Sequence, residues 1–130
     1  MPTKNRDLHG SAPDQSHAAL LLIDVINHFQ YPGGRALSRQ ALPMARRLAA
    51  FKRRAHAAGI PAVYVNDNFG RWRSDFRSIV AHCRRPGSPS ERIVGLLAPD
   101  PDDYFVLKPK HSGFYATALE TLLRYLGSET

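Results

Sequence analysis

The sequence has a single cysteine, Cys83, among its 130 residues. No disulfide can form within the chain, which fits a reducing compartment, so we expect a cytoplasmic protein. It also lacks any apolar run near the roughly 20 residues that a membrane helix needs, which argues against a membrane protein. No Gly-rich phosphate loop or nucleophile elbow is present. The six histidines have no metal-ligand spacing, and we expect neither a metal nor another cofactor.

Acidic residues are few: 11 Asp and Glu stand against 18 Lys and Arg, giving a net charge of +7. This excess suggests nucleic acid or an anionic substrate as a partner. A well-solvated basic surface is the simpler explanation, and we favour it. The basic residues of one predicted helix are expected to face solvent, and no nucleic-acid motif accompanies them: Arg46, Arg47, Lys52, Arg53 and Arg54. We therefore do not expect a nucleic-acid partner.

Polar residues dominate positions 1–17, which we expect to form a disordered tail before a domain over residues 18–130. Three apolar segments in the domain are typical of strands buried on both faces of a parallel sheet: Ala18–Ile26, Ile60–Asn66 and Tyr104–Lys108. Helical patterns follow each of them. Since crossovers between parallel strands are right-handed, this β-α-β-α-β-α order predicts an α/β fold, a parallel sheet covered by helices.

The first predicted helix carries Pro43 in its first turn and Gly59 at its C-terminal cap. Its core-facing side chains are expected at spacings of three and four residues: Met44, Leu48, Phe51, Ala55 and Ala58. A second helix is expected to start near Ser74. Its apolar stripe includes Cys83, so a buried structural role for this thiol is favoured over a nucleophile activated by the neighbouring arginines.

Polar side chains end all three predicted strands: Asp24, then Asn66 and Asp67, then Lys108. Ligands of such sheets bind beyond the carboxyl ends of the strands, where these groups can converge. An ionised carboxylate within an apolar strand is costly unless paired, and Lys108 could be the partner of Asp24. Asp24 is then either a general base or an Asp that caps a loop amide, and Lys108 alone could simply reach water. The pair together favours a site.

Three segments resemble the isochorismatase-like cysteine hydrolases. Leu-Leu-Ile-Asp-Val-Ile-Asn-His-Phe, ending at Phe29, resembles the first strand and loop of that family. Ile-Pro-Ala-Val-Tyr-Val-Asn-Asp-Asn-Phe, ending at Phe69, looks like the second, and Lys-Pro-Lys-His-Ser-Gly-Phe, from Lys108, resembles its lysine-containing strand end. The resemblance runs from about Ala18 to Gly127 and implies a three-layer Rossmann-like sheet with helices on both faces, of which this chain holds the first three β-α units.

The resemblance also implies a function, hydrolysis of a small amide or related carbonyl substrate by a catalytic Asp, Lys and Cys. By this resemblance Asp24 would be the base that activates the thiol, and Lys108 would stabilise the thiolate or the oxyanion. The expected substrate-binding residues are Phe29, Asn66, Asp67 and Trp72, although Trp72 could equally just pack. A homo-oligomer is expected. Metal-dependent nicotinamidases of the family need two histidines after the second strand, which are missing here.

The family's cysteine follows a fourth strand, and the sequence ends at Thr130, where that strand would begin. We therefore expect an incomplete chain, or a natural truncation that cannot perform thiol chemistry alone. The family's first strand is central, with the fourth beside it. Without the fourth, the first strand would be an apolar edge, which predicts poor solubility, swapping or self-association. An inactive module that pairs through this open edge is the alternative function.

Overall fold

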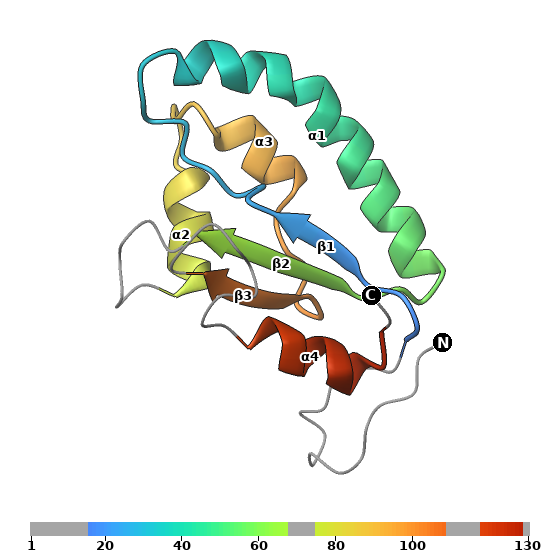
Figure 1. The fold of residues 1–130 in the computed structure, drawn as a ribbon. Coiled ribbons are helices and arrows are strands. Elements are labelled where there is room, and N and C mark those ends of the chain that lie inside the picture. Colours follow the sequence, from blue (N-terminus) through green and yellow to red (C-terminus); the bar gives the residue numbers. More distant parts are fainter. Residues whose placement is uncertain (1–15, 68–74, 109–117, 129–130) are drawn as a thin grey trace.

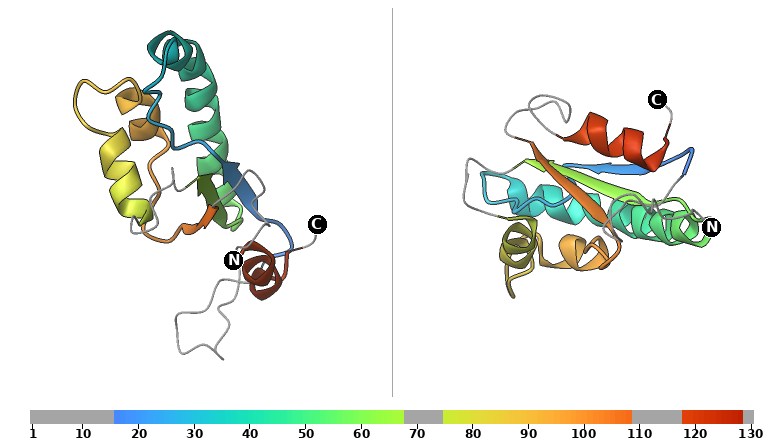
Figure 2. Two further views of the ribbon diagram at one scale, coloured as in Figure 1. Left: turned by 60° about the vertical axis from the view of Figure 1, so that its left-hand side comes forward. Right: turned by 90° about the horizontal axis from the view of Figure 1, so that it is seen from below.

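The computed structural model describes residues 16–67, 75–108 and 118–128. Three parallel strands form one sheet in the order β1-β2-β3: β1 (Leu20–Ile23), β2 (Ala62–Asp67) and β3 (Tyr104–Lys108). The helices are α1 (Gly34–Ala57), α2 (Phe76–Cys83), α3 (Glu91–Leu96) and α4 (Leu119–Leu126). Figures 1 and 2 show α1, α2 and α3 on one face of the sheet and α4 on the other. The predicted three-layer α/β fold is confirmed.

Each face of the sheet has its own core, as expected for strands whose side chains alternate between the two faces. The face under α4 is aliphatic: Val63, Val65, Val106, Leu119, Leu123 and Leu126. The opposite face packs Leu22 and Tyr64 against α2, with the ring of Phe76 5.4 Å from that of Tyr64. The sheet is therefore covered on both sides, and the free ends of its strands are the places left for polar groups.

Helix α1 differs from its prediction in length and in the face it buries. It begins at Gly34, so that Pro43 lies inside it. The buried side chains are those of Ala45, Ala49, Lys52 and Ala55, whereas Met44 and Phe51 are each about half exposed, at 49% and 50%. The predicted core face was therefore right for Ala55, which is buried, and for Leu48, which packs against the core, and wrong for Met44, Phe51 and Ala58. Small alanines let α1 approach α3, and this close packing decides the face in place of the largest apolar side chains.

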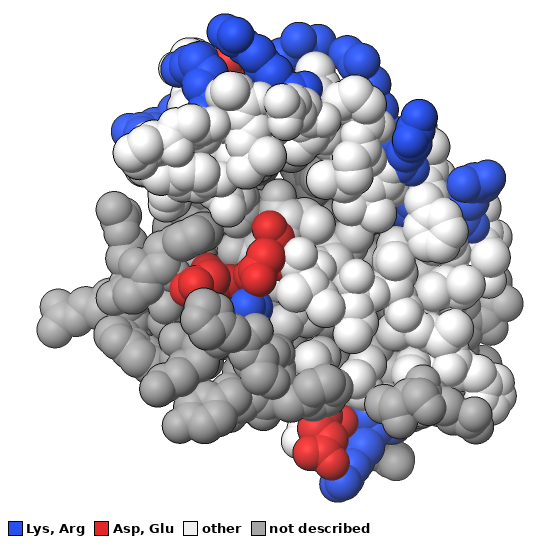
Figure 3. All heavy atoms as spheres, turned by 45° about the horizontal axis from the view of Figure 1, so that its top comes forward, with Lys and Arg blue, Asp and Glu red and all other residues white. Residues whose placement is uncertain are grey.

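The basic surface lies over α1, where Figure 3 shows lysine and arginine side chains gathered along one rim of the molecule. Arg46, Arg47, Arg53 and Arg54 are exposed, as predicted. Lys52 is not: it is 6% exposed, so its assignment to the solvent side was wrong.

In the described part of the chain, no helix is both long and apolar enough to cross a membrane.

Several element ends agree with the sequence, and the first strand is shorter than predicted. Gly59 and Gly127 follow α1 and α4 with φ of 77° and 74°, the left-handed conformation that glycine adopts freely. Strand β1 ends at Ile23 instead of Ile26, because Asp24 itself turns into the left-handed region with φ of 56°. The predicted helix start near Ser74 and most of the tail over residues 1–17 lie outside the described residues. Of that tail, Ser16 donates its backbone N–H to Leu126 O at 2.6 Å.

Candidate active site

The strand register brings the predicted polar groups to one edge of the sheet. Ile23 is paired with Val65 and Asp67 with Lys108. Asp24, the next residue after Ile23, therefore stands beside the end of β2, and Lys108 stands on the other side of the same strand. Because all three strands run parallel, these residues meet at their carboxyl ends, where sheets of this kind bind ligands.

Asp24 and Lys108 form the ion pair that the sequence predicted, although 84 positions separate them. Lys108 Nζ donates to Asp24 Oδ2 at 2.9 Å. The two partners are unequal in exposure: the Lys108 side chain is 2% exposed, whereas that of Asp24 is 49% exposed. A buried ammonium group needs a carboxylate to offset its desolvation, and this one finds it in a carboxylate that is still open to solvent.

The end of β2 holds Asp24 from the other side. The Asp24 backbone N–H donates to Val65 O at 2.9 Å, and the Asp67 backbone N–H donates to Asp24 Oδ1 at 3.3 Å. Both oxygens of the carboxylate thus have a protein donor, one charged and one neutral. A carboxylate aimed in this way, and half exposed, can accept a proton from a bound group without moving far.

The other predicted site residues lie in different surroundings. Asn66 is 1% exposed beside Asp24 and is hydrogen-bonded to the backbone of Ile26. Phe29 is 9% exposed and packs in the core between α1 and α3, with Ala45 and Leu97. Trp72 lies outside the described residues. The structure therefore brings Asp24, Asn66, Asp67 and Lys108 together, and it places Phe29 in the core cluster between α1 and α3.

Cys83 is buried at 1% exposure, as the apolar stripe of α2 predicted. Burial raises the pKa of its thiol, although a hydrogen bond from Ser90 and the charge of Arg85 oppose this. A thiol that resists ionisation is a poor nucleophile. The geometry therefore agrees with a structural role for Cys83.

A second group of charged side chains, which the sequence did not reveal, lies where α1 ends and β3 begins. Lys52 Nζ contacts Asp103 Oδ2 at 2.5 Å, Tyr64 Oη at 2.9 Å and Asp100 Oδ2 at 3.3 Å. Burial lowers the pKa of Lys52, but hydrogen bonds to Asp103 and Tyr64 outweigh it and the pKa is raised. For Tyr64 the effect of burial is the reverse: it raises the pKa of the phenol, although the hydrogen bond and the charge of Lys52 oppose it. We call these residues, together with His56, the Lys52 cluster.

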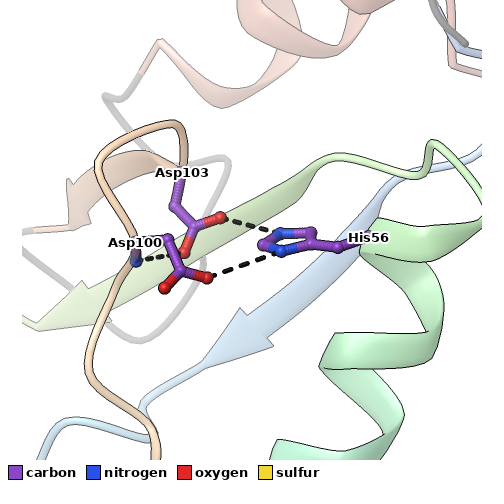
Figure 4. A group of neighbouring side chains, drawn as sticks. All are labelled: His56, Asp100 and Asp103. Carbon is purple, nitrogen blue, oxygen red and sulfur yellow. Dashed lines mark hydrogen bonds and ion pairs between the residues drawn. The ribbon is translucent and has the colours of Figure 1, made fainter.

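His56 joins the Lys52 cluster from the last turn of α1. Its two ring nitrogens lie 3.4 Å from Asp100 Oδ2 and 3.0 Å from Asp103 Oδ1 (Figure 4). Asp103 Oδ1 is buried and has no hydrogen bond of good geometry, so its contact with His56 becomes an ion pair when the imidazole is protonated. The cluster ties the end of α1 to the start of β3.

A histidine and two carboxylates within 4.8 Å of one another could hold a divalent cation. Here the ammonium group of Lys52 already contacts both carboxylates, and its charge would repel a metal ion placed beside it. We therefore interpret the cluster as an ion-pair network. A cavity of about 220 Å³ between α1 and the turn before α3 includes Arg35, Ser38 and Arg92 in its lining, but neither Asp24 nor Lys108, and we assign no site to it.

Comparison with known proteins identifies the family. Residues 18–130 match the isochorismatase domain. The chain is 38% identical over 108 residues to the uncharacterised isochorismatase family protein YaaI of Bacillus subtilis, covering 83% of this chain and 59% of that protein. It is 29% identical over 146 residues to the ureidoacrylate amidohydrolase RutB of Methylobacterium radiotolerans, covering 92% of this chain and 56% of the relative. The chain belongs to the isochorismatase family of hydrolases.

Solved structures agree with this assignment. An isochorismatase family protein from Desulfovibrio vulgaris is 26% identical, with a TM-score of 0.58, and the match covers 85% of this chain and 62% of that one. The N-carbamoylsarcosine amidase of Thermoplasma acidophilum is 28% identical, with a TM-score of 0.53, over 88% of this chain and 65% of the amidase. The chain thus spans less than two thirds of the length of these relatives.

Proposed function

We propose that this chain carries the Asp and Lys of a hydrolase that acts on a small amide or a related carbonyl compound. The observation that carries the proposal is the pair of Asp24 and Lys108, a buried ammonium group against a half-exposed carboxylate at 2.9 Å. Two relatives, a ureidoacrylate amidohydrolase and an N-carbamoylsarcosine amidase, are amide hydrolases by name, which supports this substrate class.

The proposed chemistry divides between the two side chains. The Asp24 carboxylate takes the proton of the attacking nucleophile, and the Lys108 ammonium group stabilises the negative charge that develops on the nucleophile or on the carbonyl oxygen. The resemblance to cysteine hydrolases makes that nucleophile a thiol. Cys83 is a poor candidate because it is buried on α2. We therefore expect the reactive thiol to correspond to a position in the portion of the relatives that this chain does not span.

The test uses the protein isolated from its native source, after its intact mass has been read against the 14.5 kDa of this chain. Ammonia release is followed with ureidoacrylate and N-carbamoylsarcosine, because hydrolysis of a terminal carbamoyl group liberates ammonia. Turnover that is lost in both Asp24→Asn and Lys108→Met supports the proposal. Wild-type rates in either variant would contradict it.

An alternative is an inactive module that pairs through its open sheet edge. Strand β1 forms an edge of the sheet in the described residues, and its Ile23 is 55% exposed, which favours association with another strand. We expect self-association of residues 1–130, measured by light scattering. A stable monomer without any partner would count against this alternative. A cytoplasmic location and a homo-oligomeric state are part of the hydrolase proposal.

A further inference from the structure

Asn66 is a buried polar residue at the end of β2, and both polar atoms of its side chain are hydrogen-bonded to backbone groups. Asn66 Oδ1 accepts the N–H of Ile26 at 3.2 Å. Asn66 Nδ2 donates to Ile26 O at 3.0 Å and to Asp67 O at 3.2 Å. A carboxamide has two donor hydrogens, and both are occupied here. The side chain is 1% exposed, so these contacts are shielded from competing water.

The backbone that Asn66 holds is the turn that carries Asp24. Asp24 has φ of 56°, a left-handed conformation that costs about 1–2 kcal/mol for most residues and less for Asp. This turn takes residues 24–26 out of the β1 ladder, so the polar groups of Ile26 have no strand partner of their own. Asn66 replaces that missing strand with a side chain.

Three consecutive residues of β2 therefore hold the turn at three points. Val65 O accepts the N–H of Asp24, Asn66 binds both polar groups of Ile26, and the Asp67 N–H donates to the Asp24 carboxylate. The last of these contacts and the ion pair with Lys108 depend on where the Asp24 side chain points. That direction follows from the backbone conformation which the Asn66 contacts maintain.

We propose that Asn66 is a positioning residue, which fixes the backbone of residues 24–26 and so aims the Asp24 carboxylate at the Lys108 ammonium group. This role differs from the substrate contact expected from the sequence. Its structural part stands on the hydrogen bonds alone, and only its effect on turnover rests on the proposed hydrolase function.

The chain contains its own reporter for this role, because two described lysines are buried and paired with aspartates. Lys108 is paired with Asp24, and Lys52, at 6% exposure, is paired with Asp103 in the Lys52 cluster. Acylation by a small N-hydroxysuccinimide ester, read by peptide mass spectrometry, measures the accessibility of each amine. Loss of global stability exposes both lysines together, whereas a misplaced Asp24 exposes Lys108 alone.

In Asn66→Ala we expect acylation of Lys108 to accelerate about tenfold, the scale set by losing hydrogen bonds to buried groups, while Lys52 keeps its wild-type rate. Ser90→Ala is the matched control, since the buried Ser90 also donates to a backbone carbonyl, that of Cys83 at 2.7 Å, in another part of the core. In this control, the acylation rate of Lys108 should not increase relative to that of Lys52. Equal acceleration of both lysines in Asn66→Ala, or none, would overturn the proposal.

If Asn66→Ala does not fold, Asn66→Asp carries the same test. It keeps the size of the side chain and the acceptor for the Ile26 N–H but removes the donor, and selective exposure of Lys108 is again required.

A kinetic measurement separates the positioning role of Asn66 from the proposed hydrolase function. In a protein that hydrolyses an amide, Asn66→Ala should lower kcat with little change in KM. Absence of any turnover in the wild-type protein isolated from its native source would reject the hydrolase function and leave the acylation result to decide the role of Asn66.

Discussion

Among the described residues, two lysines are buried and each is paired with an aspartate, at opposite ends of the sheet. The Lys52–Asp103 pair is closed: Asp103 is 1% exposed, and Tyr64 binds the same ammonium group. The Lys108–Asp24 pair is open, with a carboxylate that is 49% exposed and a backbone in the left-handed region. Both pairs consist of an ammonium group and a carboxylate, so they differ only in how far their surroundings leave the carboxylate exposed to solvent.

In the closed pair, the charged groups are bound by other side chains that hold the fold together. Lys52 bridges two carboxylates and a phenol, and these contacts join α1 to the turn before β3. The open pair keeps a negatively charged oxygen at the carboxyl ends of the strands, where a substrate can reach it. In our proposal, the buried ammonium group therefore serves the structure in the first case and the function in the second. Exposure of the partner carboxylate is what separates them.

The largest expected effect concerns the open pair. Asp24→Asn should lower kcat/KM for an amide substrate by about 10²–10⁴-fold, the usual contribution of a general base. Its single amide oxygen can accept from Lys108 or from the Asp67 N–H but not from both. Because the position is half exposed, water can take the other place, and the free energy of unfolding should fall by about 1–2 kcal/mol, the scale of one lost hydrogen bond to a charged group. Initial rates and urea denaturation on the same sample measure both. A large loss of stability together with activity would make Asp24 a structural residue.

The same substitution in the closed pair should act on stability. Asp103→Asn leaves Lys52 buried without its nearest carboxylate, which is expected to cost about 3–5 kcal/mol in the free energy of unfolding. Asp100→Asn is the matched control: that side chain is 58% exposed and contacts the same ammonium group, so it should cost at most about 1 kcal/mol. Urea denaturation compares them, and equal costs would show that burial of the partner does not matter.

A third prediction tests the segment that links Asp24 to α1. A Cβ atom added at Gly34 would lie 1.9 Å from the carbonyl oxygen of Phe29, itself at φ of 54°, so the backbone of this segment must shift in Gly34→Ala. We expect a loss of about 1–3 kcal/mol in stability. Gly95→Ala in α3 meets no atom within 4 Å and should be neutral or stabilising. Thermal unfolding of both variants measures the difference in stability. A Gly34→Ala protein with unchanged stability would contradict the predicted clash with Phe29.

The smallest effect is a dependence of stability on alkaline pH that comes from the closed pair. The pKa values of Lys52 and Tyr64 are both raised in the folded protein. Each group therefore holds its proton more tightly when folded, and its contribution is complete below the unfolded pKa and is lost as pH rises through the folded pKa. The free energy of unfolding should fall above about pH 10. Tyr64→Phe should make the fall shallower, and a steeper one would contradict this.

The sequence predicted the open pair better than the closed one. A carboxylate at the end of an apolar strand is visible as a break in composition, and the parallel order of the strands is enough to bring Asp24 and Lys108 to the same edge. Lys52 gives no such signal, because it is one of seven lysines and arginines on α1. Only the spacing of Ala45, Ala49 and Ala55 marks the buried face, and hydrophobic periodicity weights alanine too lightly to detect it.

The role of Asn66 was beyond the sequence for a different reason. Its place at the end of a buried strand was predicted correctly, but its partner is the backbone of Ile26, which becomes available only because Asp24 leaves the β1 ladder. Single left-handed residues outside glycine are rare and are not marked by any local pattern. The same holds for Phe29, whose ring turns into the core between α1 and α3.

The most direct test of the proposed active site measures turnover and the free energy of unfolding in Asp24→Asn and Asp103→Asn side by side, in the protein isolated from its native source. We predict contrasting outcomes, with activity lost and most of the stability kept in Asp24→Asn, and with most of the stability lost in Asp103→Asn while the remaining folded fraction still turns over substrate. If both substitutions destabilise the protein equally and neither has a separate effect on turnover, the open pair is a structural ion pair like the closed one, and the proposed active site is wrong.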